Sequence, residues 1–203
     1  MAQPAPLRDD VCANAAENHP ADGGTPRVFG DPRLETFFRH WRARLTATAW
    51  PRRADLDPIE IPRVLPHVMI TQRAAGGAEY LRVVGTHIVD HLGFDPTRRE
   101  LNTMAGDANF ADLCLELLAE MRLQNAPLYA TGRHFSPRGA TRTCSRVLLP
   151  LSDGDGAVDA AAHCIVFAAD AAAVPIAAGG PAVREHTERV AMEPAQPASG
   201  PIA

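Results

Sequence analysis

Two neighbouring β-rich runs constrain the fold of this chain more than any other feature. VMITQR starts at Val68, EYLRVVGT ends at Thr86, and the short segment AAGGA lies between them. Both runs are rich in the β-branched and aromatic side chains that strands favour. Gly76 and Gly77 can supply the positive φ angles that a tight connection needs. The pattern therefore predicts two antiparallel strands joined as a hairpin.

A long helix is predicted downstream of this hairpin. The segment DANFADLCLELLAEMRLQNAP offers Asp107 as an N-cap, and the helix must end by Asn125 and Pro127. Between the hairpin and the helix, HIVDHLGFDPTRREL is short and is broken by Gly93 and Pro96. The long helix has an apolar face at helical spacing, made of Phe110, Leu113, Cys114, Leu117, Leu118 and Met121.

Three further β-rich runs and one upstream helix complete the pattern. The runs are PLYATGRHF, TRTCSRVLLPL and AAHCIVFAA, and the turn sequence SDGDGAVD joins the last two. Asp31 and Pro32 suit the N-cap and first position of an amphipathic helix. Its apolar face contains Leu34, Phe37, Phe38, Trp41 and Leu45. The order predicts an α+β domain over residues 31–170: a five-stranded antiparallel sheet with helices inserted between strands two and three.

The two ends of the chain have a different composition. Residues 1–30 and 171–203 are rich in Ala, Pro and Gly and lack a periodic apolar pattern, so we expect them to be mostly disordered. Within the second tail, PAVREHTERVAME is the one stretch that suggests a short helix.

Composition excludes several classes of function. The chain has 203 residues and 20 positive charges, all of them arginine, so lysine chemistry is ruled out. A net charge of -4 argues against a nucleic-acid partner. Asp9 and Asp10 lie where a signal peptide needs an apolar stretch. Asp170 and Pro175 interrupt the alanine-rich segment that would otherwise resemble a membrane span. We therefore expect a cytoplasmic protein without a membrane span.

Several motifs together resemble the small bacterial stand-alone PAS proteins. They are FFRHWRARL in the first helix, PRRADLDPIEIPRVLPHVMI, YLRVVGTHIVDHLGFDPTRREL and the late strand RVLLPLSDGDG, and they span about residues 31–170. The resemblance implies a sensory or regulatory module that pairs with itself or with another protein. It also implies that a small ligand is sometimes held between sheet and helices.

The candidate ligand-binding residues each have a structural alternative. Arg53 and Asp55 lie in a proline-bounded stretch, where salt bridges and backbone hydrogen bonds would equally explain them. Tyr80 and Arg82 alternate with apolar residues on the second strand. If the apolar residues of the strands face the core, the outer face of the sheet carries Arg82, Arg142 and Arg146, which would dock a partner or simply face solvent.

Histidines and cysteines supply the remaining candidates. His87 and His91 are four residues apart, so on a helix both rings share a side and could ligate a metal or haem iron; a surface role is the alternative. Cys144 lies between two arginines that would lower the pKa of its thiol, although a buried, inert thiol is the simpler interpretation. The four cysteines are widely spaced, so we expect reduced thiols. The sequence assigns no metal site.

These observations lead to a leading hypothesis and an alternative. The first is a non-catalytic PAS protein of bacterial signalling that acts by protein contact and dimerises through Phe37, Phe38 and Trp41. The alternative is a sensor that binds a small metabolite or haem in the PAS pocket. No catalytic motif is present, so we expect no enzymatic activity. The sequence requires no cofactor, and haem and flavin both stay open as ligands.

Overall fold

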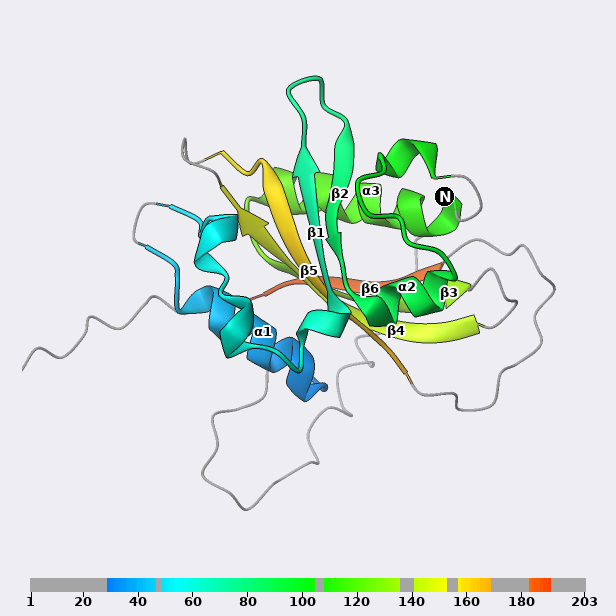
Figure 1. The fold of residues 1–203 in the computed structure, drawn as a ribbon, viewed down its shortest axis with the longest axis horizontal. Helices are drawn as coiled ribbons and strands as arrows, with labels where there is room; N and C mark the ends of the chain where they lie inside the picture. The colour runs from blue at the N-terminus through cyan, green and yellow to red at the C-terminus, as the bar shows by residue number, and fades with distance from the viewer. Residues whose placement is uncertain are drawn as a thin grey trace, which may run out of the picture.

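Six antiparallel strands form one sheet, in the order β2-β1-β5-β4-β3-β6, in the computed structural model of the chain (Figure 1). The structure describes residues 29–46, 49–104, 108–135, 141–152, 157–168 and 183–190. Five of the six strands are those that the sequence predicts, which confirms the PAS-like α+β fold. The strands are β1 (Val68–Arg73), β2 (Glu79–Val84), β3 (Leu128–Phe135), β4 (Thr141–Leu151), β5 (Ala160–Phe167) and β6 (Val183–Arg189).

The predicted hairpin joins β1 to β2. The pairing ends at Arg73 opposite Glu79, and the turn is closed by a 2.8 Å hydrogen bond from the Ala74 amide to the Ala78 carbonyl. Gly77 has a φ of 88°, the left-handed conformation that glycine adopts without strain. The turn chemistry of AAGGA therefore explains where the hairpin reverses.

Helices inserted between β2 and β3 cover one face of the sheet. They are α2 (Thr86–Leu92), the short 3-10 turn η4 (Leu101–Thr103) and α3 (Ala108–Gln124). The predicted apolar face of α3 is buried against β3, β4 and β5, which confirms that helix. The predicted N-cap Asp107 lies outside the described residues.

The opposite face of the sheet is covered by α1 (Pro32–Arg42) (Figure 1). Asp31 caps this helix as predicted, since its Oδ1 accepts a 2.8 Å hydrogen bond from the Arg33 amide. A connector with three 3-10 turns then leads to β1: η1 (Arg53–Asp55), η2 (Pro58–Glu60) and η3 (Leu65–His67). The sheet thus lies between two separate apolar clusters, and all eight residues of β5 are buried.

The burial of α1 corrects the predicted dimer interface. Phe37, Phe38 and Trp41 are 0%, 2% and 0% exposed because they pack on the chain's own sheet. The Trp41 indole also donates a 3.0 Å hydrogen bond to the carbonyl of Pro150 in β4. A dimer of this conformation cannot use these three side chains.

The strand β6 corrects a second prediction. The stretch that suggested a short helix contains Val183–Arg189, which pairs antiparallel with β3 from Leu128 opposite Arg189 to Arg133 opposite Val183. A 3.0 Å hydrogen bond from the Val190 amide to the Pro127 carbonyl extends this contact. The other residues of the two predicted tails lie outside the described residues, apart from Phe29 and Gly30 at the start of the fold. Among the described residues, no helix combines the length and apolar character needed to cross a bilayer.

Candidate functional site

A layer of polar side chains lies buried between the sheet and the helices α2 and α3. Arg146 of β4 is 1% exposed, and His163 of β5 and His134 of β3 are fully covered. Buried polar groups of this kind need hydrogen-bond partners. A neutral polar group that is buried without a partner destabilises the fold by about 1–3 kcal/mol, and a charged group by more. Their contacts therefore decide what the layer can do.

Arg146 has an unusual set of contacts for a buried guanidinium. Its Nη1 and Nη2 atoms lie 3.6 Å from Cys114 Sγ and 3.5 Å from Cys144 Sγ. Thiol sulfurs are weak acceptors, and within the described parts of the chain no carboxylate forms an ion pair with this arginine. Arginine keeps its proton at any physiological pH. The interior therefore holds a positive charge without an acidic partner.

His163 lies on the same side of the sheet as Arg146 and stays neutral. Burial, together with the positive charges of Arg146 and Arg122, lowers the pKa of His163 to about 3. Its Nε2 lies 3.2 Å from the hydroxyl of Thr71 in β1. The Nδ1 atom is buried and has no hydrogen-bond partner among the described residues. It can accept or donate one more hydrogen bond.

Two other histidines meet beside α2. His91 Nε2 is 2.6 Å from His134 Nδ1, and the His91 ring stacks on Phe167 with ring centroids 3.7 Å apart. The ring of His87, one turn earlier on α2, instead packs against His67 at 4.5 Å between centroids. The His87 ring also lies 6.3 Å from Phe167 between centroids, so the two candidate iron ligands share that neighbour, while each packs against a different histidine. Among the described residues, no group of three or more metal-binding side chains is found.

The position of Arg146 corrects the sequence-based assignment of strand faces. Arg82, Arg142 and Arg146 were expected together on the outer face. Val147, the next residue of β4, packs in the same apolar cluster as the buried residues of α1. Successive residues of a strand point to opposite faces, so Arg146 points to the α3 side of the sheet. Arg142 is four residues earlier in the strand and therefore points to the same side. Arg82 lines a hollow on the α1 side. The prediction failed because both faces of β4 are buried.

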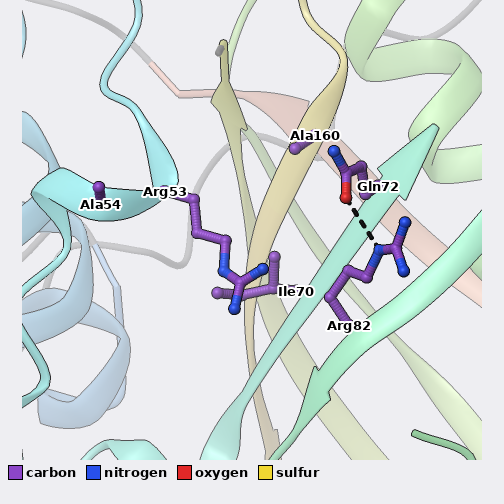
Figure 2. A pocket seen from close by; sticks show the side chains of 6 residues that line it. All are labelled: Arg53, Ala54, Ile70, Gln72, Arg82 and Ala160. Carbon is purple, nitrogen blue, oxygen red and sulfur yellow. Dashed lines mark hydrogen bonds between the residues drawn. The ribbon is translucent and has the colours of Figure 1, made fainter. Parts of the chain in front are cut away.

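That hollow on the outer face is the second candidate site (Figure 2). It has a volume of about 400 Å³ and lies between the connector and strands β1, β2 and β5. The sheet therefore carries one candidate site on each face. The residues that line the hollow are Arg53, Ala54, Ile70, Gln72, Arg82 and Ala160.

The structure brings together two of the five residues predicted to bind a ligand. Arg53 and Arg82 share the outer hollow. Asp55 is used structurally: its Oδ2 accepts a 2.8 Å hydrogen bond from the Arg52 amide at the start of η1. Tyr80 donates a 3.3 Å hydrogen bond to Glu100. The ring of His87, a residue of α2, packs against His67, and His87 does not line the hollow.

Sequence reasoning did not find the interior layer as a site. Arg146 was placed on the wrong face, and no role was assigned to His134 and His163. The only signal was the pair of cysteines, since Cys114 was expected in the buried face of the long helix and Cys144 in a strand. Their convergence on one guanidinium depends on the tertiary packing of α3 on β4.

The arrangement of sheet and helices matches a known class. A family model described as PAS domain matches residues 30–166, and the chain therefore belongs to the PAS domain family. This confirms the resemblance inferred from its motifs.

Solved structures with a similar fold include light-sensing domains and a sensor kinase. The LOV domain of the blue-light activated histidine kinase EL346 from Erythrobacter litoralis is 18% identical over 49% of this chain and 93% of that chain, with a TM-score of 0.37. The light-state structure of the Aureochrome1 LOV photoreceptor is 10% identical over 53% and 85%, with a TM-score of 0.40. The sensory box sensor histidine kinase from Vibrio cholerae is 9% identical over 55% and 88%, with a TM-score of 0.37. No curated protein matches the chain.

Proposed function

We propose that this protein is a non-catalytic PAS regulator of bacterial signalling that passes its signal on by contact with a partner protein. The observation that carries the proposal is the PAS family match over residues 30–166. The burial of the titratable side chains in the interior supports the non-catalytic part of the proposal. His163 and Arg146 are covered by α3 and the sheet, so neither can meet a soluble substrate without opening the core.

Two exposed apolar side chains offer positions at which to test this contact. Ile59 on η2 is 83% exposed and Leu123 near the end of α3 is 87% exposed. Large apolar side chains of this kind are typical anchors of protein interfaces when they reach a pocket on a partner. They lie on elements that cover opposite faces of the sheet, so they report on two separate surfaces.

Site-specific photo-crosslinking in the native host tests the proposal. We would place a photoreactive amino acid at Ile59 or Leu123 and identify the products by mass spectrometry. We expect one position to capture a signalling protein, and excess unlabelled chain to compete that product away. Arg39, exposed on α1, is the control position. Equal capture at all three positions, or none at Ile59 and Leu123, would contradict contact through these surfaces.

A second function, the binding of a small ligand inside the PAS core, is favoured by one observation. Arg146 is buried, and its partners among the described residues are two thiol sulfurs. An anionic group placed beside it would supply the missing negative charge, and the open Nδ1 of His163 lies on the same side of the sheet. A buried ion pair with good geometry is far less costly than a buried single charge.

Purified wild-type protein and an Arg146→Met variant distinguish the two functions. We would record the absorbance spectrum and then the native mass of each. A Soret or flavin band would identify a coloured ligand. Extra mass in the wild type that is lost from the variant supports an anion at Arg146, whereas two proteins of bare-chain mass support the contact function alone.

A further inference from the structure

The outer hollow has the composition of a small-molecule site. Its floor is apolar, since Ile70 is 8% exposed and Ala160 is 3% exposed. Its rim carries polar groups from Arg53, Gln72 and Arg82. Ligand sites are typically concave, mostly apolar and about 300–1,000 Å³ in volume, with a few placed polar groups. The hollow, at about 400 Å³, falls within that range.

A β-bulge places Arg82 at this hollow. The pairing of β1 with β2 passes from Thr71 opposite Leu81 to Ile70 opposite Val83, which leaves Arg82 as the extra residue. Bulges redirect side chains and are common beside functional sites. The Arg82 Nε donates a 2.8 Å hydrogen bond to Gln72 Oε1, and this bond holds the guanidinium next to the hollow while its two Nη groups stay available (Figure 2).

Arg53 reaches the hollow from the connector. Figure 2 shows its side chain extending from η1 toward Ile70. The backbone that carries it is held firmly, because Asp55 caps η1 and the Asp55 carbonyl accepts a hydrogen bond from Arg44 Nε. The connector and the strand β2 are separate segments of the chain, and together they place two arginines beside the same apolar floor.

The two arginines lack acidic partners. In the described parts of the chain, no ion pair joins Arg53 or Arg82 to a carboxylate, although five other arginines form such pairs. Two guanidinium groups beside one hollow create a positive potential that attracts anions. Their planar N–H groups match the two oxygens of a carboxylate.

The neighbouring sheet edge excludes an added peptide strand as the occupant. The outer edge of β2 is already used by residues 98–100: the Leu81 amide donates to the Arg99 carbonyl at 2.9 Å, and the Arg98 amide donates to the Leu81 carbonyl at 2.6 Å. Recognition at the hollow must therefore come from side chains. This favours a small molecule over a strand of a partner protein.

We infer that the hollow binds a small monocarboxylate with a short apolar body. The carboxylate bridges Arg53 and Arg82, and the apolar body lies on Ile70 and Ala160. This site is on the α1 face of the sheet and is separate from the interior layer at Arg146. It therefore goes beyond the function proposed above, because ligand binding here requires neither an opened core nor a protein partner.

Titrations of the full-length chain with butyrate, acetate and inorganic phosphate test the inference. The arginine Nε–Hε signals in nitrogen-15 NMR spectra report each guanidinium. We expect butyrate to shift the Arg53 and Arg82 signals saturably, and acetate to bind about fifteenfold more weakly because it lacks two methylenes. Phosphate that binds as tightly as butyrate would overturn the role of the apolar floor.

Three variants make the test specific. Arg53→Gln and Arg82→Gln should each weaken butyrate binding about tenfold, the typical effect of losing a charge-assisted hydrogen bond. Arg63→Gln is the matched control, since Arg63 is an exposed arginine of the same connector that lines a different hollow. Loss of affinity in the control equal to that in the other two variants, or unchanged affinity in all three, would overturn the inference. Retained folding of each variant is checked by its amide spectrum.

Discussion

His163 is a residue whose environment forbids a charge. It is fully buried in β5, and burial lowers its pKa to about 3, with Arg146 as the next largest cause. In an unfolded chain the pKa of histidine is about 6.5. Between these two values the unfolded chain binds a proton that the folded protein does not.

The free energy of unfolding should therefore fall as pH falls below about 6.5. One such histidine contributes a slope of about 1.4 kcal/mol per pH unit, and its stabilising effect is complete above about pH 6.5. His67 and His40 add to the slope, because burial lowers the pKa of each. Urea unfolding measured from about pH 7.5 to about pH 5 checks this. A His163→Gln variant that keeps the wild-type slope would show that His163 is not responsible.

Arg146 gives a second prediction at the scale of one residue. Replacing a buried charge by an apolar side chain of similar size is often neutral or stabilising. We expect Arg146→Met to leave the free energy of unfolding unchanged or raise it by about 1–2 kcal/mol in protein free of ligand. A loss of more than about 2 kcal/mol in urea unfolding would instead mean that the contacts with Cys114 and Cys144 are a net stabilising network.

At the scale of elements, the junction between β2 and α2 depends on a close contact at Gly85. A Cβ atom on Gly85 would lie 2.3 Å from the carbonyl oxygen of Pro66 in η3. The Gly85 amide also donates a 2.8 Å hydrogen bond to the Val68 carbonyl. The close approach of the two backbones, rather than an unusual φ angle, is what requires glycine.

Gly85→Ala should destabilise the protein by about 2–3 kcal/mol, because neither backbone can move without breaking this junction. Thermal and urea unfolding measure the change. Gly76→Ala is the control, since a Cβ atom there meets nothing within 4 Å, and we expect its effect to stay within about 0.5 kcal/mol. Equal stability of the two variants would contradict the contact with Pro66.

The strand β6 is the element that sequence patterns missed. Its sequence, VREHTER, contains one apolar residue and five charged or histidine residues, so it has neither helical periodicity nor the enrichment that marks a buried strand. It lies at the edge of the sheet, where charged residues are common because one side of the strand faces solvent. Its backbone bonds to β3 are what place it.

Truncation after residue 182 should expose the outer edge of β3. The amides of Leu128–Phe135 that pair with β6 would then lose their acceptors, and their hydrogen exchange should accelerate while exchange in β5 stays slow. Hydrogen exchange followed by mass spectrometry compares the truncated and full chains. Unchanged exchange across β3 would show that β6 is not paired in solution.

At the scale of the whole molecule, α1 belongs to the core of one chain. Phe38 and Trp41 are stacked with ring centroids 5.9 Å apart, and Trp41 also stacks on Trp50 at 5.8 Å. These rings seal the second apolar cluster against the sheet. A surface for self-association must therefore be sought on other residues.

Polar replacement of Phe38 and Trp41 should unfold the domain rather than separate a folded dimer. Truncating one buried aromatic side chain typically costs about 3–5 kcal/mol, so losing two exceeds the stability of most domains. Circular dichroism and light scattering together measure folding and mass. Arg39→Ala, on the exposed side of the same helix, should change stability by less than about 0.5 kcal/mol. A folded monomer from the double variant would restore the dimer hypothesis.

The sequence by itself determined where most elements begin and end. The Asp31 cap, the glycine turn at residues 76–77 and the apolar face of α3 are local signals, because they depend on backbone conformation and on the periodicity of neighbouring residues. The motifs also determined the PAS family. Two of the ligand candidates, Arg53 and Arg82, line one hollow, whereas Asp55, Tyr80 and His87 have structural partners of their own.

Only the tertiary structure decided which way the central strands face and what completes the sheet. A strand buried on both sides has no polar face to reveal its orientation, so Arg146 was misplaced until the packing of α3 placed it among thiols. An edge strand such as β6 is stabilised by backbone hydrogen bonds to a neighbour that is distant in sequence. The same reason applies to the outer hollow, because its two arginines meet only once the connector has folded back over β1.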